Sequence, residues 1–246
     1  IFVRKGCVFL ALAALAIFLF QSNLMAAGLI LSHTGTIRVT KPDGVVLVIE
    51  PNQTLPDIPS GSRVEVLSGS LEIEPSEGFI QLVLGGSVAT VKAGDSLSAA
   101  IDEKTGMANF KVNAGQVKVI TGNTTTTIGA GQEAQVGIDK ATGITTVRSI
   151  TGEIETITVG VKAMVPEGAM IKIKADPKTR NVHIECVQGA LKVIAIDGTV
   201  VELKEGQPID TPGSAEGEIQ SFDEVSRFAP EVEPAQPVRP EGSKYE

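Results

Sequence analysis

Residues 102–106 read Asp-Glu-Lys-Thr-Gly, and the pattern returns as Asp-Lys-Ala-Thr-Gly at 139–143 and as Asp-Pro-Lys-Thr-Arg at 176–180, each step being 37 residues. Glycines recur at the same step in two series, which are Gly78, Gly115, Gly152 and Gly189, and Gly94, Gly131 and Gly168, with Gly206 one residue late. Self-similarity at a fixed period indicates a repeat architecture. About five related units therefore fill residues 28–212.

The first unit is shorter and begins at Gly35. Its segments Gly35-Thr-Ile-Arg-Val and Asp43-Gly-Val-Val-Leu match Gly189-Ala-Leu-Lys-Val and Asp197-Gly-Thr-Val-Val near the other end of the repeat region. The repeat therefore spans the body of the chain, and its first and last units share a common pattern.

Apolar and polar residues alternate within each unit, which is typical of half-buried strands. Before Gly189 the inward positions are even, as at Val182 and Ile184, and after it they are odd, as at Leu191 and Val193. Because a one-residue shift exchanges the two faces of a strand, we expect this glycine to mark a bulge or a sharp bend. The inward pairs after the glycines are Ile80/Leu82, Val117/Val119, Ile154/Thr156 and Leu191/Val193.

Helical periodicity is absent from the repeat region, so the predicted fold class is all-β, with repeated short antiparallel strands. Units of three or four strands suit a β-roll, a jelly-roll-like sandwich or a short solenoid, and the sequence leaves these forms open. We expect lysines and, in the first unit, Pro51, Pro56 and Pro59 to protect the sheet edges in part.

Residues 1–27 have the parts of a secretory signal peptide. Arg4 and Lys5 precede an apolar run from Gly6 to Phe20, and small residues follow. The run is short for a membrane span, so we expect cleavage after Ala26 or Ala27, with an uncleaved anchor as the alternative. The protein is then exported to the periplasm or the extracellular space, and it contacts the membrane only if this segment is retained.

Residues 213–246 differ from the body in composition. Ile219, Phe222, Val225 and Phe228 are spaced three apart, which predicts a short amphipathic helix. The rest is rich in proline and glutamate, which predicts a disordered acidic tail.

Composition excludes several classes of function. The formal net charge is −8, Trp is absent, and the body has only Phe79 and Phe110 as aromatic residues. These features argue against nucleic-acid binding and against an aromatic-lined pocket. After removal of the signal segment, Cys186 is the single cysteine, so we expect no internal disulfide and a buried small hydrophobic side chain.

The residues that could carry chemistry have simpler structural explanations. His183 and His33 are the only histidines, and His183 lies between inward residues, so its side chain should face solvent; no zinc or iron site is expected. The Asp-x-x-Thr-Gly runs recur once per unit, which favours a tight turn over a phosphorylated aspartate. Ala93-Gly94-Asp95, Ala130-Gly131-Gln132 and Glu205-Gly206-Gln207 are interpreted as hairpin turns, and Thr124–Thr127 as ordinary strand residues.

Two pairs of acids, Glu153/Glu155 and Glu72/Glu74, lie two residues apart and could share one strand face. Such a pair could serve a carboxylate-based hydrolase, but it is also typical of a solvated strand. We therefore predict no enzyme activity, no catalytic, metal-binding or cofactor-binding residue and no cofactor. The residues that bind a partner stay unassigned.

Three segments together resemble the periplasmic domain of the FecR type. They are Arg63-Val-Glu-Val-Leu-Ser-Gly69-Ser-Leu-Glu-Ile, Gly115-Gln-Val-Lys-Val-Ile and Ile128-Gly-Ala-Gly-Gln-Glu-Ala-Gln-Val. The resemblance covers residues 35–140 best and implies an all-β repeat in the cell envelope. In founding members of that family, the domain senses an outer-membrane transporter while a cytoplasmic segment controls a sigma factor. Only five residues precede the apolar run here, so we expect no cytoplasmic regulatory arm.

The main hypothesis is an exported, non-enzymatic β-repeat module that binds an envelope protein or polymer through strand faces or edges. The alternative is a periplasmic sensor in a transporter and sigma-factor system. The turns around Gly69 and Gly94 also resemble those of cupins, but two distant histidines do not supply a cupin metal site. A cupin-like or carboxylate-based enzyme is the remaining hypothesis, and the oligomeric state is not predicted.

Overall fold

The computed structural model describes residues 26–214, which form 21 strands in two sheets. The first sheet, sheet A, has the order β21 (Pro208–Pro212), β18 (Asn181–Gln188), β17 (Met170–Ala175), β14 (Ile144–Thr151), β13 (Glu133–Asp139), β10 (Ala108–Ala114), β9 (Ser96–Ile101), β6 (Ser70–Pro75), β1 (Ala26–His33) and β4 (Ile58–Pro59). The second, sheet B, has the order β20 (Val200–Lys204), β19 (Ala190–Ile194), β16 (Val161–Val165), β15 (Ile154–Thr158), β12 (Thr124–Gly129), β11 (Gln116–Thr121), β8 (Ser87–Lys92), β7 (Phe79–Leu84), β5 (Arg63–Val66), β2 (Ile37–Thr40) and β3 (Val46–Ile49).

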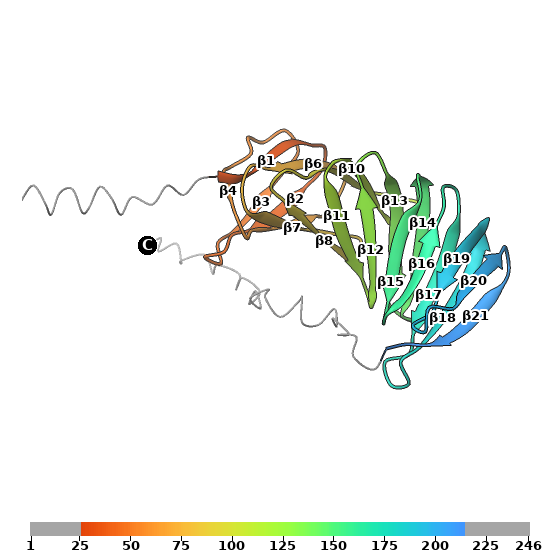
Figure 1. Cartoon of the computed structure of the whole chain (residues 1–246). Helices are drawn as coiled ribbons and strands as arrows, with labels where there is room; N and C mark the ends of the chain where they lie inside the picture. The colour runs from red at the N-terminus through yellow and green to blue at the C-terminus, as the bar shows by residue number, and fades with distance from the viewer. Residues whose placement is uncertain (1–25, 215–246) are drawn as a thin grey trace, which may run out of the picture.

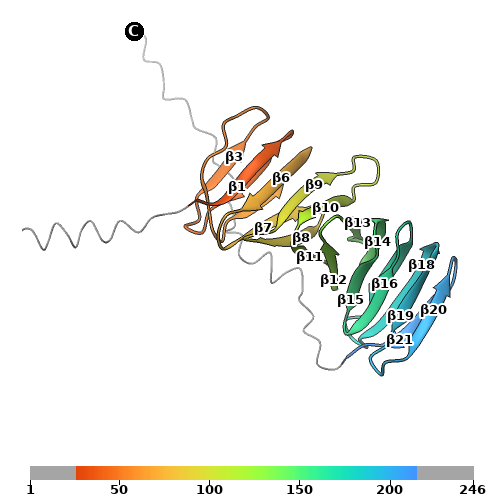
Figure 2. The same cartoon turned by 45° about the horizontal axis from the view of Figure 1, so that its top comes forward.

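The two sheets lie face to face, and the strands follow one another along the molecule from the N-terminal to the C-terminal end (Figures 1 and 2). Each regular unit contributes one hairpin to sheet A and the next to sheet B, as β13–β14 and then β15–β16 do. The predicted all-β fold is confirmed. Among the forms left open, the structure is an open two-layer sandwich of stacked four-strand units.

Glycines with positive φ mark the places where the chain passes between the sheets. Gly115, with φ of 77°, joins β10 in sheet A to β11 in sheet B, and Gly152 and Gly189 do the same in later units. The inward residues switch between even and odd numbers at these glycines, because the chain passes to the opposite sheet and faces the core from the other side. The predicted sharp bend is confirmed. A Cβ at Gly115 would lie 2.0 Å from Asp95 Oδ1, so space as well as φ requires glycine.

One interpretation of the turns is wrong in its detail. Gly94, Gly131 and Gly206 have positive φ as expected, but they do not close hairpins. Gly94, for example, joins β8 of sheet B to β9 of sheet A. A positive-φ glycine reverses the chain equally well within a sheet or between sheets, so the turn residue alone did not distinguish the two.

The Asp-x-x-Thr runs are the hairpin turns of sheet A, as predicted. Asp102 Oδ1 accepts hydrogen bonds from the backbone amides of Lys104 (2.9 Å) and Thr105 (3.2 Å). Asp139 accepts from Ala141, and Asp176 from Lys178, in the same way. The recurrence therefore reflects architecture, because each carboxylate satisfies amides of its own turn.

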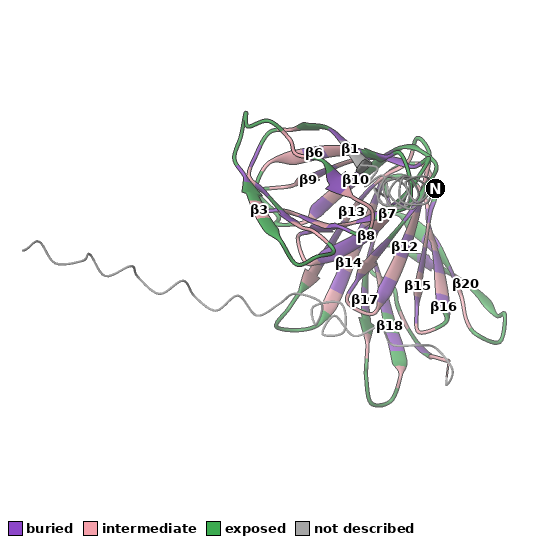
Figure 3. Ribbon diagram, turned by 90° about the vertical axis from the view of Figure 1, so that its left-hand side faces the viewer, coloured by how far each residue is buried: buried purple, intermediate pink, exposed green. Residues whose placement is uncertain are grey.

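The core lies between the sheets and is built from the alternating inward residues (Figure 3). The expected inward pairs, from Ile80/Leu82 to Leu191/Val193, are all buried, and so is Phe110. Hydroxyl groups also enter the interior. Thr124–Thr127 lie in β12 as predicted, and the buried hydroxyl of Thr124 also forms a 2.7 Å hydrogen bond with that of Thr158 on β15.

The first unit departs from the regular pattern. Its strands β5 and β7 pair in parallel, because the single strand β6 between them lies in the opposite sheet. Its hairpin β2–β3 nevertheless matches β19–β20, as the sequence segments starting at Gly35 and Gly189 predict. The two matching hairpins therefore stand at opposite ends of sheet B.

Predictions for the two ends of the chain lie mostly outside the described residues. The first described strand begins at Ala26, so the predicted cleavage after Ala26 or Ala27 would fall at its start. The predicted amphipathic helix and acidic tail lie beyond Ser214, outside residues 26–214. Within that range no helix is long and apolar enough to cross a membrane.

Candidate functional site

The residues weighed for chemistry occupy structural positions. Cys186 is fully buried as expected, and burial raises the pKa of its thiol, with the nearby Glu205 charge adding to the effect. His33 Nδ1 lies 2.8 Å from the carbonyl oxygen of Gly35. A buried thiol with a raised pKa is a poor nucleophile, so Cys186 belongs to the core.

His183 faces solvent, as predicted, but it has a partner that the sequence did not indicate. Its Nδ1 lies 2.8 Å from Asp210 Oδ1 on the neighbouring strand β21, and the two side chains are 46% and 79% exposed. A shallow depression beside them is also lined by Asp176, whose carboxylate accepts amides of its own turn. A pair this exposed, with Asp176 already engaged, offers no desolvated site for acid–base chemistry.

Only one of the two predicted acid pairs lies on a single strand. Glu153 lies before the start of β15, so only Glu155 belongs to that strand, and Glu155 forms a 2.6 Å ion pair with Lys162. Glu72 and Glu74 do share β6. Among residues 26–214, no group of three or more His, Cys, Asp or Glu side chains is placed to hold a metal ion.

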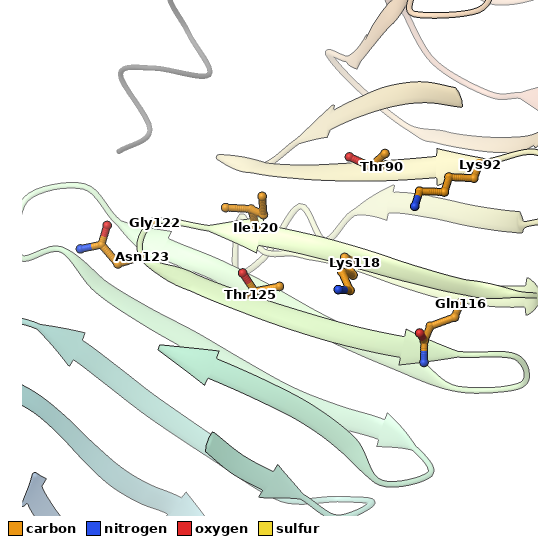
Figure 4. Close-up of a pocket in the computed structure, with 8 residues that line it drawn as sticks. All are labelled: Thr90, Lys92, Gln116, Lys118, Ile120, Gly122, Asn123 and Thr125. Carbon is orange, nitrogen blue, oxygen red and sulfur yellow. The ribbon is translucent and has the colours of Figure 1, made fainter. Parts of the chain in front are cut away.

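A groove of about 500 Å³ lies on the outer face of sheet B, across β8, β11 and β12 (Figure 4). We call it the lysine groove. It is lined by Thr90, Lys92, Gln116, Lys118, Ile120, Gly122, Asn123 and Thr125. Its position follows from the register, in which Lys118 faces Thr90 on one side and Thr127 on the other.

The second candidate surface is a sheet edge. Within residues 26–214, the terminal strands of sheet A are β21 and β4, and those of sheet B are β20 and β3. Prolines lie in β21 and in the two-residue strand β4, and β20 carries Glu202 and Lys204. Only β3, with the sequence Val-Leu-Val-Ile, has neither a charge nor a proline. The predicted protection by Pro51, Pro56 and Pro59 therefore does not include β3 itself.

The hydrogen-bonding direction of β3 follows from its turn. Lys41 N donates to Val45 O at 2.9 Å, so Lys41 and Val45 are a hydrogen-bonded pair. Such pairs alternate along an antiparallel ladder, and the next one is Val39 with Leu47. The backbone N–H and C=O groups of Val46 and Val48 therefore point away from β2. Within residues 26–214 no strand lies on that side. The Val46 and Val48 side chains are 40% and 51% exposed on the outer face.

Sequence reasoning expected binding through strand faces or edges, but it assigned no binding residues and located neither surface. The edge carried a readable signal, a run of apolar residues without charge or proline between Gly44 and Glu50. The lysine groove carried none, because it joins strands that are distant in sequence.

In comparisons with known proteins, no family model, no curated protein and no solved structure matches this chain. The FecR resemblance therefore rests on the quoted segments alone. The surfaces themselves carry the functional argument.

Proposed function

We propose that the protein is an exported, non-enzymatic binding module that captures an extended segment of an envelope protein on the edge of β3. The observation that carries the proposal is that β3 alone among the four terminal strands lacks charge and proline. Natural sheets protect such edges unless they are covered or used.

Strand addition matches the chemistry of this edge. The outward N–H and C=O groups of Val46 and Val48 can form main-chain hydrogen bonds with an incoming strand. The exposed valine side chains would pack against alternate residues of that strand. The preferred partner is thus an extended, uncharged segment with apolar residues at every second position.

The test is a comparison of matched variants of the full chain in capture from an envelope extract, with a photo-crosslinker at position 46 to report the contact. Val48→Pro removes one outward N–H but no bond to β2, and should abolish capture. Val48→Thr keeps the N–H and should retain it. Glu202→Pro removes the corresponding N–H at the other end of sheet B and should also retain it.

Two results would overturn the proposal. One is that Val48→Pro and Val48→Thr capture the same crosslinked partner equally well. The other is that the chain turns over a small substrate and yields no crosslink at position 46. A partner identified as a membrane regulator of a sigma factor would favour the sensor alternative, with the same edge making the contact.

A further inference from the structure

The lysine groove places two positive charges close together in a lining without acidic side chains. Lys92 on β8 and Lys118 on β11 project from the same side of the sheet as Gln116 and Thr125 (Figure 4). Lys118 faces Thr90, and Lys92 lies two residues further along β8. This is a diagonal neighbour at about 7–8 Å between backbones, within reach of long side chains. Among residues 26–214, no Asp or Glu lines the groove.

Three other cations on this face lie in ion pairs. Lys162 pairs with Glu155 at 2.6 Å, Lys192 with Glu202 at 3.9 Å, and Arg38 with Glu65 at 2.9 Å. Neither Lys92 nor Lys118 has an ion pair within residues 26–214. In a chain with a formal charge of −8, two neighbouring lysines without an ion pair form a local attraction for anions.

The other lining groups indicate what kind of anion fits. Gln116 and Asn123 carry amides, and Thr90 and Thr125 carry hydroxyls, so each can both donate and accept hydrogen bonds. Ile120 is the single large apolar side chain of the lining, which leaves few anchors for an apolar peptide. The part of the chain that the structure describes contributes no aromatic ring to the lining on which a nucleic-acid base could stack.

We infer that the lysine groove binds an acidic polysaccharide, with sugar carboxylates on Lys92 and Lys118 and sugar hydroxyls on the surrounding amides and hydroxyls. The groove is open, and its lining comes from three neighbouring strands, as a chain-like ligand lying across the sheet requires. This inference is independent of the proposed strand addition, which uses β3 at the end of the sheet.

The experiment is calorimetric titration of the full chain with an oligogalacturonate, beside its methyl-esterified form and poly-glutamate. The acidic sugar should bind, and added salt should weaken it because salt screens exposed charges. The esterified sugar and poly-glutamate should bind at least about tenfold more weakly, a difference of about 1.4 kcal/mol.

Substitutions locate the site. Lys92→Gln with Lys118→Gln should weaken oligogalacturonate binding by about tenfold or more, since each lysine supplies a charge-assisted contact. Lys192→Gln, on the same face but beside Glu202, is the matched control and should change it less than about twofold. The thermal unfolding midpoint of each variant confirms that the fold is intact.

The inference is wrong if the acidic sugar does not bind, or if poly-glutamate binds as tightly, which would assign the groove to an acidic peptide. Equal losses from Lys192→Gln and from the double substitution would show attraction by overall charge alone. Each of these results leaves the β3 proposal untouched, because Val48→Pro is measured on a different surface.

Discussion

The two end hairpins of sheet B, β2–β3 and β19–β20, share a local structure and differ in their edges. Both hairpins have an Asp-Gly turn in which the aspartate Oδ1 accepts a hydrogen bond from the backbone amide two residues further on. The donor is Val45 in the first hairpin and Thr199 in the second. Both end strands also show the same alternation of burial.

The difference lies in the outward positions. Where β20 has Glu202 opposite Lys192, β3 has Val48 opposite Arg38, and Arg38 pairs with Glu65 on its other side. The same hairpin is thus closed to pairing at one end and open at the other. Edge chemistry can change without any change in the turn or the register, so function can be placed on a repeat scaffold by two or three residues.

The largest expected effect tests the hydrogen-bonding direction on which this comparison depends. Leu47→Pro and Val201→Pro each remove an N–H that bonds the neighbouring strand, so each should lower the free energy of unfolding by about 2–4 kcal/mol. Val48→Pro and Glu202→Pro remove outward N–H groups and should cost less than about 1 kcal/mol. Urea unfolding of the four variants measures this.

If Leu47→Pro and Val48→Pro lower the free energy of unfolding equally, the assignment of outward groups on β3 is incorrect. The same holds for Val201→Pro and Glu202→Pro on β20. The strand-addition proposal would fail with the assignment at β3.

A second and smaller effect tests whether the two turns are equivalent. Gly44 and Gly198 have φ of 85° and 83°, and an added Cβ would meet no atom within 4 Å at either position. Alanine at either position should therefore lower the free energy of unfolding only through backbone strain, by about 1–2 kcal/mol, and by the same amount in both hairpins. A clear inequality in urea unfolding would show that the hairpins differ in more than their edges.

Local patterns predicted most of the fold. Alternation in strands such as β18 and the glycine at position 115 are properties of neighbouring residues, and they predicted strands, inward faces and bends. The order of strands in each sheet is not a local property. That is why the turn at Gly94 was assigned to a hairpin although it passes between the sheets.

The candidate surfaces depend on strand order, which explains why they were missed. Lys92 and Lys118 are 26 residues apart in the chain and become neighbours because β9 and β10 between them enter the other sheet. Likewise, the apolar sequence of β3 resembles that of a buried strand until its place at the end of sheet B is known.

A third prediction concerns substitutions that exchange the edge residues of β3 and β20. Because these positions are exposed, the free energy of unfolding should stay within about 0.5 kcal/mol of wild type. Glu202→Val with Lys204→Val should give β20 an open edge and cause concentration-dependent association in sedimentation velocity. Val48→Glu should have the opposite effect at β3 and reduce any association of the wild type. Identical sedimentation of all three proteins would mean that charge at these positions does not control pairing.

The smallest effect concerns acid stability at the β19–β20 turn. The backbone amide and the hydroxyl of Thr199 hold the pKa of Asp197 below its usual value. A lowered folded-state pKa stabilises the fold above the unfolded value of about 3.9, and this contribution is lost as the pH falls through the folded-state pKa. Asparagine at position 197 does not titrate. The urea midpoint of wild type should therefore be slightly higher than that of Asp197→Asn near neutral pH, and the difference between the two midpoints should disappear in acid. The pKa values of Asp102, Asp139 and Asp176 are lowered by amides and hydroxyls of their own turns, so the same change there should behave alike. The absence of such a difference at any pH would mean that the turn oxygen, which asparagine retains, and not its charge, provides the stabilisation.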